Sequence, residues 1–502
     1  MPYTVGLQTA AAAFLSAGLP IQFTFAIVSF LLIVFLLDAF QHDVPDTPKS
    51  LPRCSLLAIH PFFRKRFEFL NWGIYATGST VFKFKLLRNT VVVVSGESAR
   101  QAFFAAKELD LTEGFKILSG AIPMVKGVTS DLQSKRIALI HKRLAAVQRE
   151  ASLSQLIPVI LEDIRKQMDS WDGAGTFDPF DKIYELLFQV TIRSLSCSEI
   201  ADDPVLVSRL KVLYDKLETG TTPATVLLPW LPTPSMIKKL WATKEIYDIV
   251  VRAIDARQKS GVYKRDTLQM LLETGDDRLV VVGFIMGLII AGARATGTTA
   301  CWLSTYLGGH PEWRAKAAQE VSSLLAAHWS ASSERESLSK RLAAIPLKAW
   351  ETEAPVLDSL IRETTRVAQP HVAMRRNIGR DIYIDGKIIP TGSYVVYPFS
   401  DVHLDPELYS DPWKFDPGRQ EPKEVPLSYI GWGAGKTTCL GTRLAKVELK
   451  LVTAMLVLGF RHSVVDADDQ LRSLPTPNWN DTLLCRPNER FYLKYEKTDQ
   501  YL

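Results

Sequence analysis

The chain has 502 residues, of which 47% are apolar and 23% charged, and its formal net charge is +5. This apolar content supports a large buried core, while so small a net charge argues against a strongly electrostatic nucleic-acid binder. The five cysteines are widely spaced and odd in number, with no CxxC pair, which argues against a disulfide framework and a structural zinc site.

The N-terminal segment is the most apolar part of the chain. Residues 1–37 carry no charged side chain, and the stretch exceeds the roughly 20 residues that a helix needs to span a bilayer. A cleaved signal peptide is the alternative, but no basic segment precedes the stretch, and basic residues follow it. We therefore expect an uncleaved membrane anchor at residues 1–40, a proline-rich linker at 41–56 and a single cytosolic domain at 57–502.

The first elements of that domain are expected to be mixed. Residues 81–94 first alternate between apolar and basic side chains and then form an apolar run, with Arg88-Asn89 as the turn signal, which predicts a β-hairpin. Residues 132–160 have a basic helical pattern that usually marks a solvated helix face. Residues 222–234 are rich in proline and strongly apolar for a connection, which indicates either a buried loop or one that touches the membrane.

Residues 279–307 predict a long helix in which Arg294 is the only charged residue. Its length is close to that of a membrane span. Small residues cluster between 291 and 300, however, and these favour a central core helix that lets a large ligand lie against its backbone.

A second helix, over residues 357–367, places Glu363 and Arg366 three residues apart on one face. Such an isolated pair is usually a surface ion pair of little energetic weight. Short strands with turn residues follow between 381 and 397, and then a proline-rich acidic segment that ends at Arg419.

Cys439 lies in a glycine-rich loop that leads directly into a predicted helix. Unpaired N–H groups and the helix dipole stabilise an anion at such a position, which favours the thiolate form that binds metal. A small buried cysteine and a phosphate-binding loop are the alternatives. The segment Gly431–Thr437 is one residue short of a Walker A loop, so we interpret Cys439 as a candidate metal ligand.

Together and in this order, the segments resemble the cytochrome P-450 superfamily of haem-thiolate enzymes. The family has an aromatic residue seven before its cysteine, glycine four before and glycine two after, which match Trp432, Gly435 and Gly441. The resemblance covers residues 45 to 495. It implies a mainly α fold with small β-sheets, preceded here by the transmembrane helix.

Two further motifs carry the resemblance. The family's Glu-x-x-Arg helix matches Glu363 and Arg366, and its Phe-x-Pro-x-Arg string ends here at Arg419. In the family these three side chains form a buried ionic triad that supports the Cys loop. The resemblance further implies haem b as cofactor, with Cys439 as the axial iron ligand. The residues that we expect to hold the haem are Cys439, Trp432, Gly433, Gly435, Lys436, Thr437, Gly441, Lys142, Arg375, Arg376, Ala291 and Gly292.

The chain departs from the family pattern around the haem. Trp432 stands where the family usually has Phe, and Thr437 stands where it has Arg or His, with Lys436 as a substitute cation. On the basic helix Ala138 and Lys142 replace the usual Trp and Arg. These changes are expected to alter details of haem binding, not its existence.

A further departure concerns proton delivery. Where the family has an acid and an alcohol in the distal helix, this chain has Arg294 and Ala295, and Thr296 is the nearest hydroxyl. We therefore name Thr296 and Arg294 as the candidate catalytic residues.

The resemblance implies a monooxygenase of the endoplasmic reticulum membrane that oxidises a hydrophobic small molecule, such as a terpenoid, sterol or other secondary metabolite. Electrons are expected from NADPH through an acidic flavoprotein reductase, with cytochrome b5 as a further donor and with Lys436 and Arg443 as docking residues. Three alternatives remain. Arg294 and Ala295 also fit a family relative that isomerises or dehydrates without O₂; the others are a non-enzymatic haem-binding protein and a phosphate-loop protein.

Overall fold

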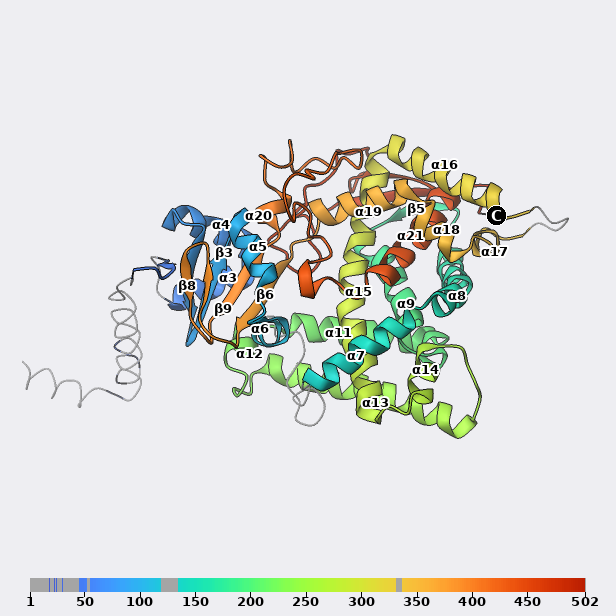
Figure 1. Ribbon diagram of the computed structural model, residues 1–502. Helices are drawn as coiled ribbons and strands as arrows, with labels where there is room; N and C mark the ends of the chain where they lie inside the picture. The colour runs from blue at the N-terminus through green and yellow to red at the C-terminus, as the bar shows by residue number, and fades with distance from the viewer. Residues whose placement is uncertain are drawn as a thin grey trace, which may run out of the picture.

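In the computed structural model the described residues are 45–51, 55–118, 134–330 and 336–501, with isolated positions between 18 and 29 (Figure 1). The predicted anchor at 1–40 and part of the linker at 41–56 therefore fall outside the described residues. The largest sheet lies at one end of the molecule and helices make up most of the rest. The expected mainly α fold with small β-sheets is confirmed.

The largest sheet has the strand order β1-β2-β3-β9-β6-β4. β2 and β3 form the predicted hairpin, although their turn is Leu87–Arg88, one residue earlier than the sequence signal. The strands of this sheet are β1 (Lys49–Ser50), β2 (Val81–Leu86), β3 (Asn89–Val94), β4 (Leu109–Asp110), β6 (Val372–Asn377) and β9 (Tyr394–Pro398). The two smaller sheets contain β5 (Ala174–Phe177), β10 (Phe460–Val465) and β11 (Tyr492–Lys497), and β7 (Ile382–Ile384) with β8 (Lys387–Ile389).

Several helices begin with the residues that favour a helix start. Asp178 accepts a hydrogen bond from the Phe180 N–H, for example, and Pro179 occupies the first helical position. The helices that surround the centre of the molecule are α7 (Ser134–Val147), α8 (Glu150–Asp169), α9 (Pro179–Leu195), α11 (Pro204–Thr219), α13 (Pro234–Ser260), α16 (Pro311–His328), α19 (Pro355–Val367) and α21 (Thr442–Gly459). The remaining ones are α3 (Ser55–Arg64), α4 (Arg66–Thr77), α5 (Glu97–Ala105), α6 (Leu111–Leu118), α10 (Ser198–Ala201), α12 (Pro223–Leu227), α14 (Thr267–Glu273), α17 (Leu338–Ala343), α18 (Leu347–Thr352), α20 (Ser400–His403) and the 3₁₀ turn η1 (Gly435–Thr437).

The long helix α15 (Arg278–Gly309) runs through the middle of the molecule (Figure 1). Among the described helices it alone is long and apolar enough to cross a bilayer, and half of its most apolar window is buried. It packs against α9, α19, α21 and β10. A Cβ added at Gly297 would come within 2.8 Å of the Tyr184 ring, so glycine is what lets α15 approach α9 this closely. These contacts support the expected core helix.

The core contains a carboxyl group at Glu448 of α21, which is only 2% exposed. Ser194 of α9 hydrogen-bonds to it, whereas its Oε1 has no hydrogen-bond partner among the described residues. Burial raises the pKa of Glu448 to about 7, because the loss of hydration outweighs the bond to Ser194.

Glu448→Gln is expected to stabilise the protein at pH 8 and to have little effect at pH 5. Because the folded pKa is raised, the wild type loses stability as the pH rises from the unfolded value of 4.5 to about 7. The loss is on the order of 3 kcal/mol when the group is fully ionised. Denaturation midpoints at both pH values measure it, with Glu185→Gln as the exposed control on α9. A Glu448→Gln effect that is equal at both pH values contradicts this prediction.

Candidate active site around Cys439

Cys439 lies between η1 and α21 and is exposed. Its N–H donates a 2.7 Å hydrogen bond to the carbonyl oxygen of Trp432, and its own carbonyl accepts from the Thr442 hydroxyl at 2.8 Å. The helix begins directly after Gly441, as the sequence predicts. The backbone of the loop therefore holds the thiol at the start of α21.

Two glycines of the loop have left-handed backbones, Gly433 with φ 72° and Gly435 with φ 57°. A Cβ at Gly435 would also come within 2.7 Å of the Phe104 carbonyl oxygen, so the loop packs against the end of α5 only with glycine there. Gly441 is different, since its φ is −90°. A Cβ added at Gly441 would lie 3.9 Å from the Cys439 Sγ, an ordinary contact distance, so there is open space beside the thiol on this side.

The structure brings Glu363, Arg366 and Arg419 together in one buried network. Arg366 donates two hydrogen bonds of 2.8 Å to the Glu363 carboxylate, and Arg419 Nε lies 3.4 Å from Glu363 Oε1. Arg366 also donates to the carbonyl oxygens of His403 and Pro412, at 2.6 and 2.8 Å. These bonds join α19 to the segment that precedes the Cys loop.

A second link between α19 and the Cys loop was not predicted from the sequence. The Thr365 and Tyr429 hydroxyls lie 2.6 Å apart, and the Arg362 guanidinium lies 4.0 Å from the centre of the Tyr429 ring. The N–H of Ile430 donates to Nε2 of His403 at 3.1 Å. Burial, with Arg366 adding to it, holds the pKa of His403 well below its usual value, so the neutral imidazole accepts this bond.

Arg375 and Arg376 point to opposite faces of the sheet, because they are successive residues of β6. Arg375 donates to the Phe103 carbonyl oxygen at 2.9 Å and to the hydroxyl of Thr437. Burial lowers the pKa of Arg375 to about 10, which leaves it charged at neutral pH, and its Nε has no hydrogen-bond partner among the described residues. Arg376 instead forms an ion pair with Glu113 at 3.7 Å, away from the Cys loop.

Gln148 also holds the loop, and no pattern in a single sequence would have singled it out. Its Nε2 donates to the Leu440 carbonyl at 2.7 Å, and its Oε1 accepts from the Leu444 N–H at 3.1 Å.

Arg443, expected to dock a reductase, forms an ion pair with Glu351 at 2.5 Å. Lys436 and Lys142 are exposed.

The middle of α15 presents small side chains, with Ala291 exposed halfway along a helix that is otherwise largely buried. Arg294, about one turn further along α15, pairs with Glu218 of α11. Gly292 faces α9, since an added Cβ would lie 3.4 Å from Leu195.

Thr296 lies one turn beyond Gly292 on α15 and is buried. Sequence reasoning grouped Arg294 with Thr296 as catalytic, whereas the structure joins Arg294 to Glu218.

Known proteins are similar to this chain over most of its length. The cytochrome P450 family profile matches residues 48–495. Cytochrome P450 monooxygenase AacuE of Aspergillus aculeatus is 29% identical over 441 residues, which cover 84% of this chain and 87% of that protein. Sterol 14-demethylase of Arabidopsis thaliana is 25% identical over 490 residues, which cover 93% of this chain and 94% of that protein. Retinoic acid-bound cyanobacterial CYP120A1 shares the fold, with a TM-score of 0.70 at 21% identity over 91% of this chain and 100% of that one.

The chain belongs to the cytochrome P450 family. Its similarity to proteins named monooxygenases makes it an oxidoreductase of the monooxygenase type, as the sequence motifs predict. The family implies a haem cofactor, a redox partner and a hydrophobic substrate. A phosphate-loop protein is thereby excluded.

Glu363→Gln is expected to destabilise the protein by about 3–5 kcal/mol, because Arg366 would remain buried without a countercharge. Glu162→Gln is the matched control. It breaks an ion pair of the same Glu-x-x-Arg spacing on α8, between Glu162 and Arg165. These two side chains are 39% and 32% exposed, whereas Glu363 and Arg366 are 7% and 2% exposed. The control is expected to cost at most about 1 kcal/mol. Denaturation midpoints measure both, and equal losses for the two variants contradict the prediction.

Proposed function

We propose that this protein is a haem-thiolate monooxygenase that inserts one atom of O₂ into a hydrophobic small molecule, with electrons from NADPH through a reductase. The observation that carries the proposal is the Cys439 thiol, which the backbone bond to Trp432 holds exposed at the start of α21. A cysteine at a helix start, close to N–H donors, is suited to ligate haem iron as a thiolate.

The residues around Cys439 fit a haem. Gly441 leaves the space beside Sγ open, and Arg375 offers a buried cation with an unpartnered Nε beside the same loop. We assign Cys439 as the iron ligand and Arg375, with Thr437, as the partner of a haem propionate. Ala291 of α15 would face the other side of the ring. When bound, the haem supplies the activation of O₂.

Proton delivery is proposed to depend on Thr296 and ordered water, since Ala295 carries no hydroxyl. Arg294 would then act as a positioning residue that holds α15 to α11 through Glu218. The isomerase or dehydratase alternative is favoured by the same two residues, Arg294 and Ala295. The names of the relatives favour monooxygenation.

The proposal includes an anchor at residues 1–40 in the endoplasmic reticulum membrane, with the domain in the cytosol. The reductase, with cytochrome b5 as a further donor, would dock near Lys436, because Arg443 is already paired with Glu351. A terpenoid, sterol or other secondary metabolite suits an enzyme whose connection at 222–234 exposes Trp230 and Leu231.

Arg375→Gln is expected to speed haem loss at least tenfold, because it removes the cation that would pair a propionate. Arg376→Gln is the control, since Arg376 lies on the opposite face of β6. Transfer of haem to an excess of a haem-scavenging protein measures both rates. If Arg376→Gln released haem as fast as Arg375→Gln, the assignment of the propionate to Arg375 would be wrong.

The reduced, CO-bound wild type is expected to show the red-shifted Soret band of a thiolate ligand, and Cys439→Ser is expected to lose it. Cys485→Ser is the control, because Cys485 is fully buried. Product formation from a library of apolar compounds should require O₂, NADPH and reductase together. Turnover without O₂ or reductase would instead support the isomerase or dehydratase alternative. A Cys439→Ser protein that kept the red-shifted band would contradict the assignment of Cys439 as the iron ligand.

A further inference from the structure

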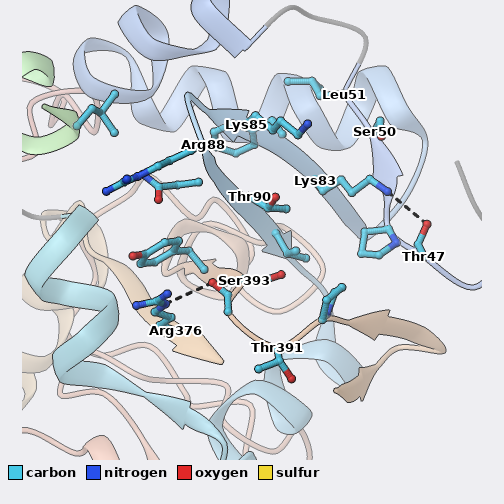
Figure 2. Close-up of a pocket in the computed structure, with 18 of the residues that line it drawn as sticks. Thr47, Ser50, Leu51, Lys83, Lys85, Arg88, Thr90, Arg376, Thr391 and Ser393 are labelled. Carbon is cyan, nitrogen blue, oxygen red and sulfur yellow. Dashed lines mark hydrogen bonds between the residues drawn. The ribbon is translucent and has the colours of Figure 1, made fainter. Parts of the chain in front are cut away.

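A pocket of about 700 Å³ opens on the largest sheet, at residues other than those of the Cys439 loop. Figure 2 labels residues of β1, β2, β3 and β6, and of the turn before β9, around it. The residues that line it are Thr47, Pro48, Ser50, Leu51, Lys83, Phe84, Lys85, Arg88, Asn89, Thr90, Val92, Val226, Leu227, Pro229, Arg376, Pro390, Thr391, Gly392, Ser393 and Tyr394.

The charge of this lining is one-sided. Arg88 and Arg376 are two of its four cationic residues, and no carboxylate lines the pocket in the described part of the chain. The other two, Lys83 and Lys85, alternate with Phe84 along β2 and so belong to the opposite face of the sheet. Glu113 approaches Arg376 to 3.7 Å, but both side chains are more than a third exposed, so water screens that pair. The pocket therefore has a positive potential that favours an anion.

Arg88 and Arg376 provide the part best suited to hold an anion. Arg88 follows Leu87, whose φ of 54° turns the hairpin tip, and Figure 2 shows Arg88 and Arg376 on one side of the pocket. The Arg376 guanidinium lies 5.3 Å from the centre of the Tyr394 ring. Burial raises the pKa of Tyr394, Arg376 and Arg88 oppose that rise, and Glu113 adds to it. Lys83 belongs to a different part and donates to Thr47 at 3.3 Å.

The wall beside these cations is apolar. Val226 and Leu227 of α12 are buried against the same sheet face, together with Phe84. The chain then leaves α12 through Pro229 to Trp230 and Leu231, which are 74% and 37% exposed. A ligand that touches both the cations and α12 must therefore be amphiphilic, with its apolar part directed toward this exposed surface.

We propose that the pocket binds an anionic phospholipid, with the phosphate between Arg88 and Arg376 and an acyl chain along Val226 and Leu227. Guanidinium groups match phosphate oxygens in a bidentate geometry, and the Tyr394 hydroxyl adds a donor. Free phosphate shares the headgroup chemistry but leaves the apolar wall unused. The proposal does not depend on haem or on the monooxygenase reaction.

Calorimetric titration of the full-length protein in an uncharged detergent tests this assignment. The ligands are dihexanoyl phosphatidic acid, dihexanoyl phosphatidylcholine, glycerol 3-phosphate and inorganic phosphate. The phosphatidic acid is expected to bind at least tenfold more tightly than each of the other three. The double variant Arg88→Gln/Arg376→Gln is expected to weaken that binding at least tenfold.

Arg380→Gln is the matched control, because Arg380 is an exposed arginine that follows β6 but does not line the pocket. Its affinity for phosphatidic acid should stay within twofold of wild type, and thermal melting checks that each variant is folded. Equal affinities for inorganic phosphate and phosphatidic acid would assign the pocket to a free anion and contradict the proposal that it binds a phospholipid. Equal affinities of the folded double variant and wild type would overturn the site itself.

Discussion

The structure around Cys439 depends on one buried charge network. Arg366 is withdrawn from water and its charge is compensated by Glu363, with Arg419 at the edge. Backbone carbonyl oxygens accept hydrogen bonds from the remaining guanidinium N–H groups of Arg366. Burying a charge is costly unless every donor finds a partner, so the network accepts only one arrangement of α19 and the segment from 403 to 419. That segment leads directly into the glycine loop. The position of the thiol therefore depends on an interaction whose residues all lie at least twenty residues upstream of it.

Much of this could be predicted from the sequence. The Cys loop, the Glu-x-x-Arg helix and Arg419 are local patterns with fixed spacing, and the long apolar helix with its small residues gave the core helix α15. The alternation of apolar and polar residues predicted the hairpin of β2 and β3, but the predicted turn, Arg88-Asn89, is one residue later than the observed one. The reason is that Leu87 takes a left-handed conformation that bulky residues rarely adopt, so the sequence does not mark it as a turn residue.

The remaining features depend on contacts between distant segments. Whether Arg375 or Arg376 faces the loop is decided by the register of β6 against β9. Gln148 and Leu440 meet across 292 residues, and Arg294 and Glu218 across 76, so no local periodicity reports either pair. Arg294 stands at the family's acid position, and its ion-pair partner Glu218 lies on another helix.

The hydrogen bond from the Cys439 N–H to the Trp432 carbonyl has a consequence for how freely this loop can change. Both atoms belong to the backbone, and the turn between them relies on the left-handed glycines at 433 and 435. Two hydroxyls reinforce this turn, since Thr437 donates to the Ala434 carbonyl at 3.0 Å and Thr438 donates to the Gly435 carbonyl at 2.9 Å. Trp432 contributes its backbone carbonyl to the bond with Cys439, so a change of its side chain can alter the polarity beside the thiol and leave that bond in place. A change at Thr437 would instead remove a hydroxyl that holds the loop, so tuning and placement of the ligand are separable at position 432 and coupled at position 437.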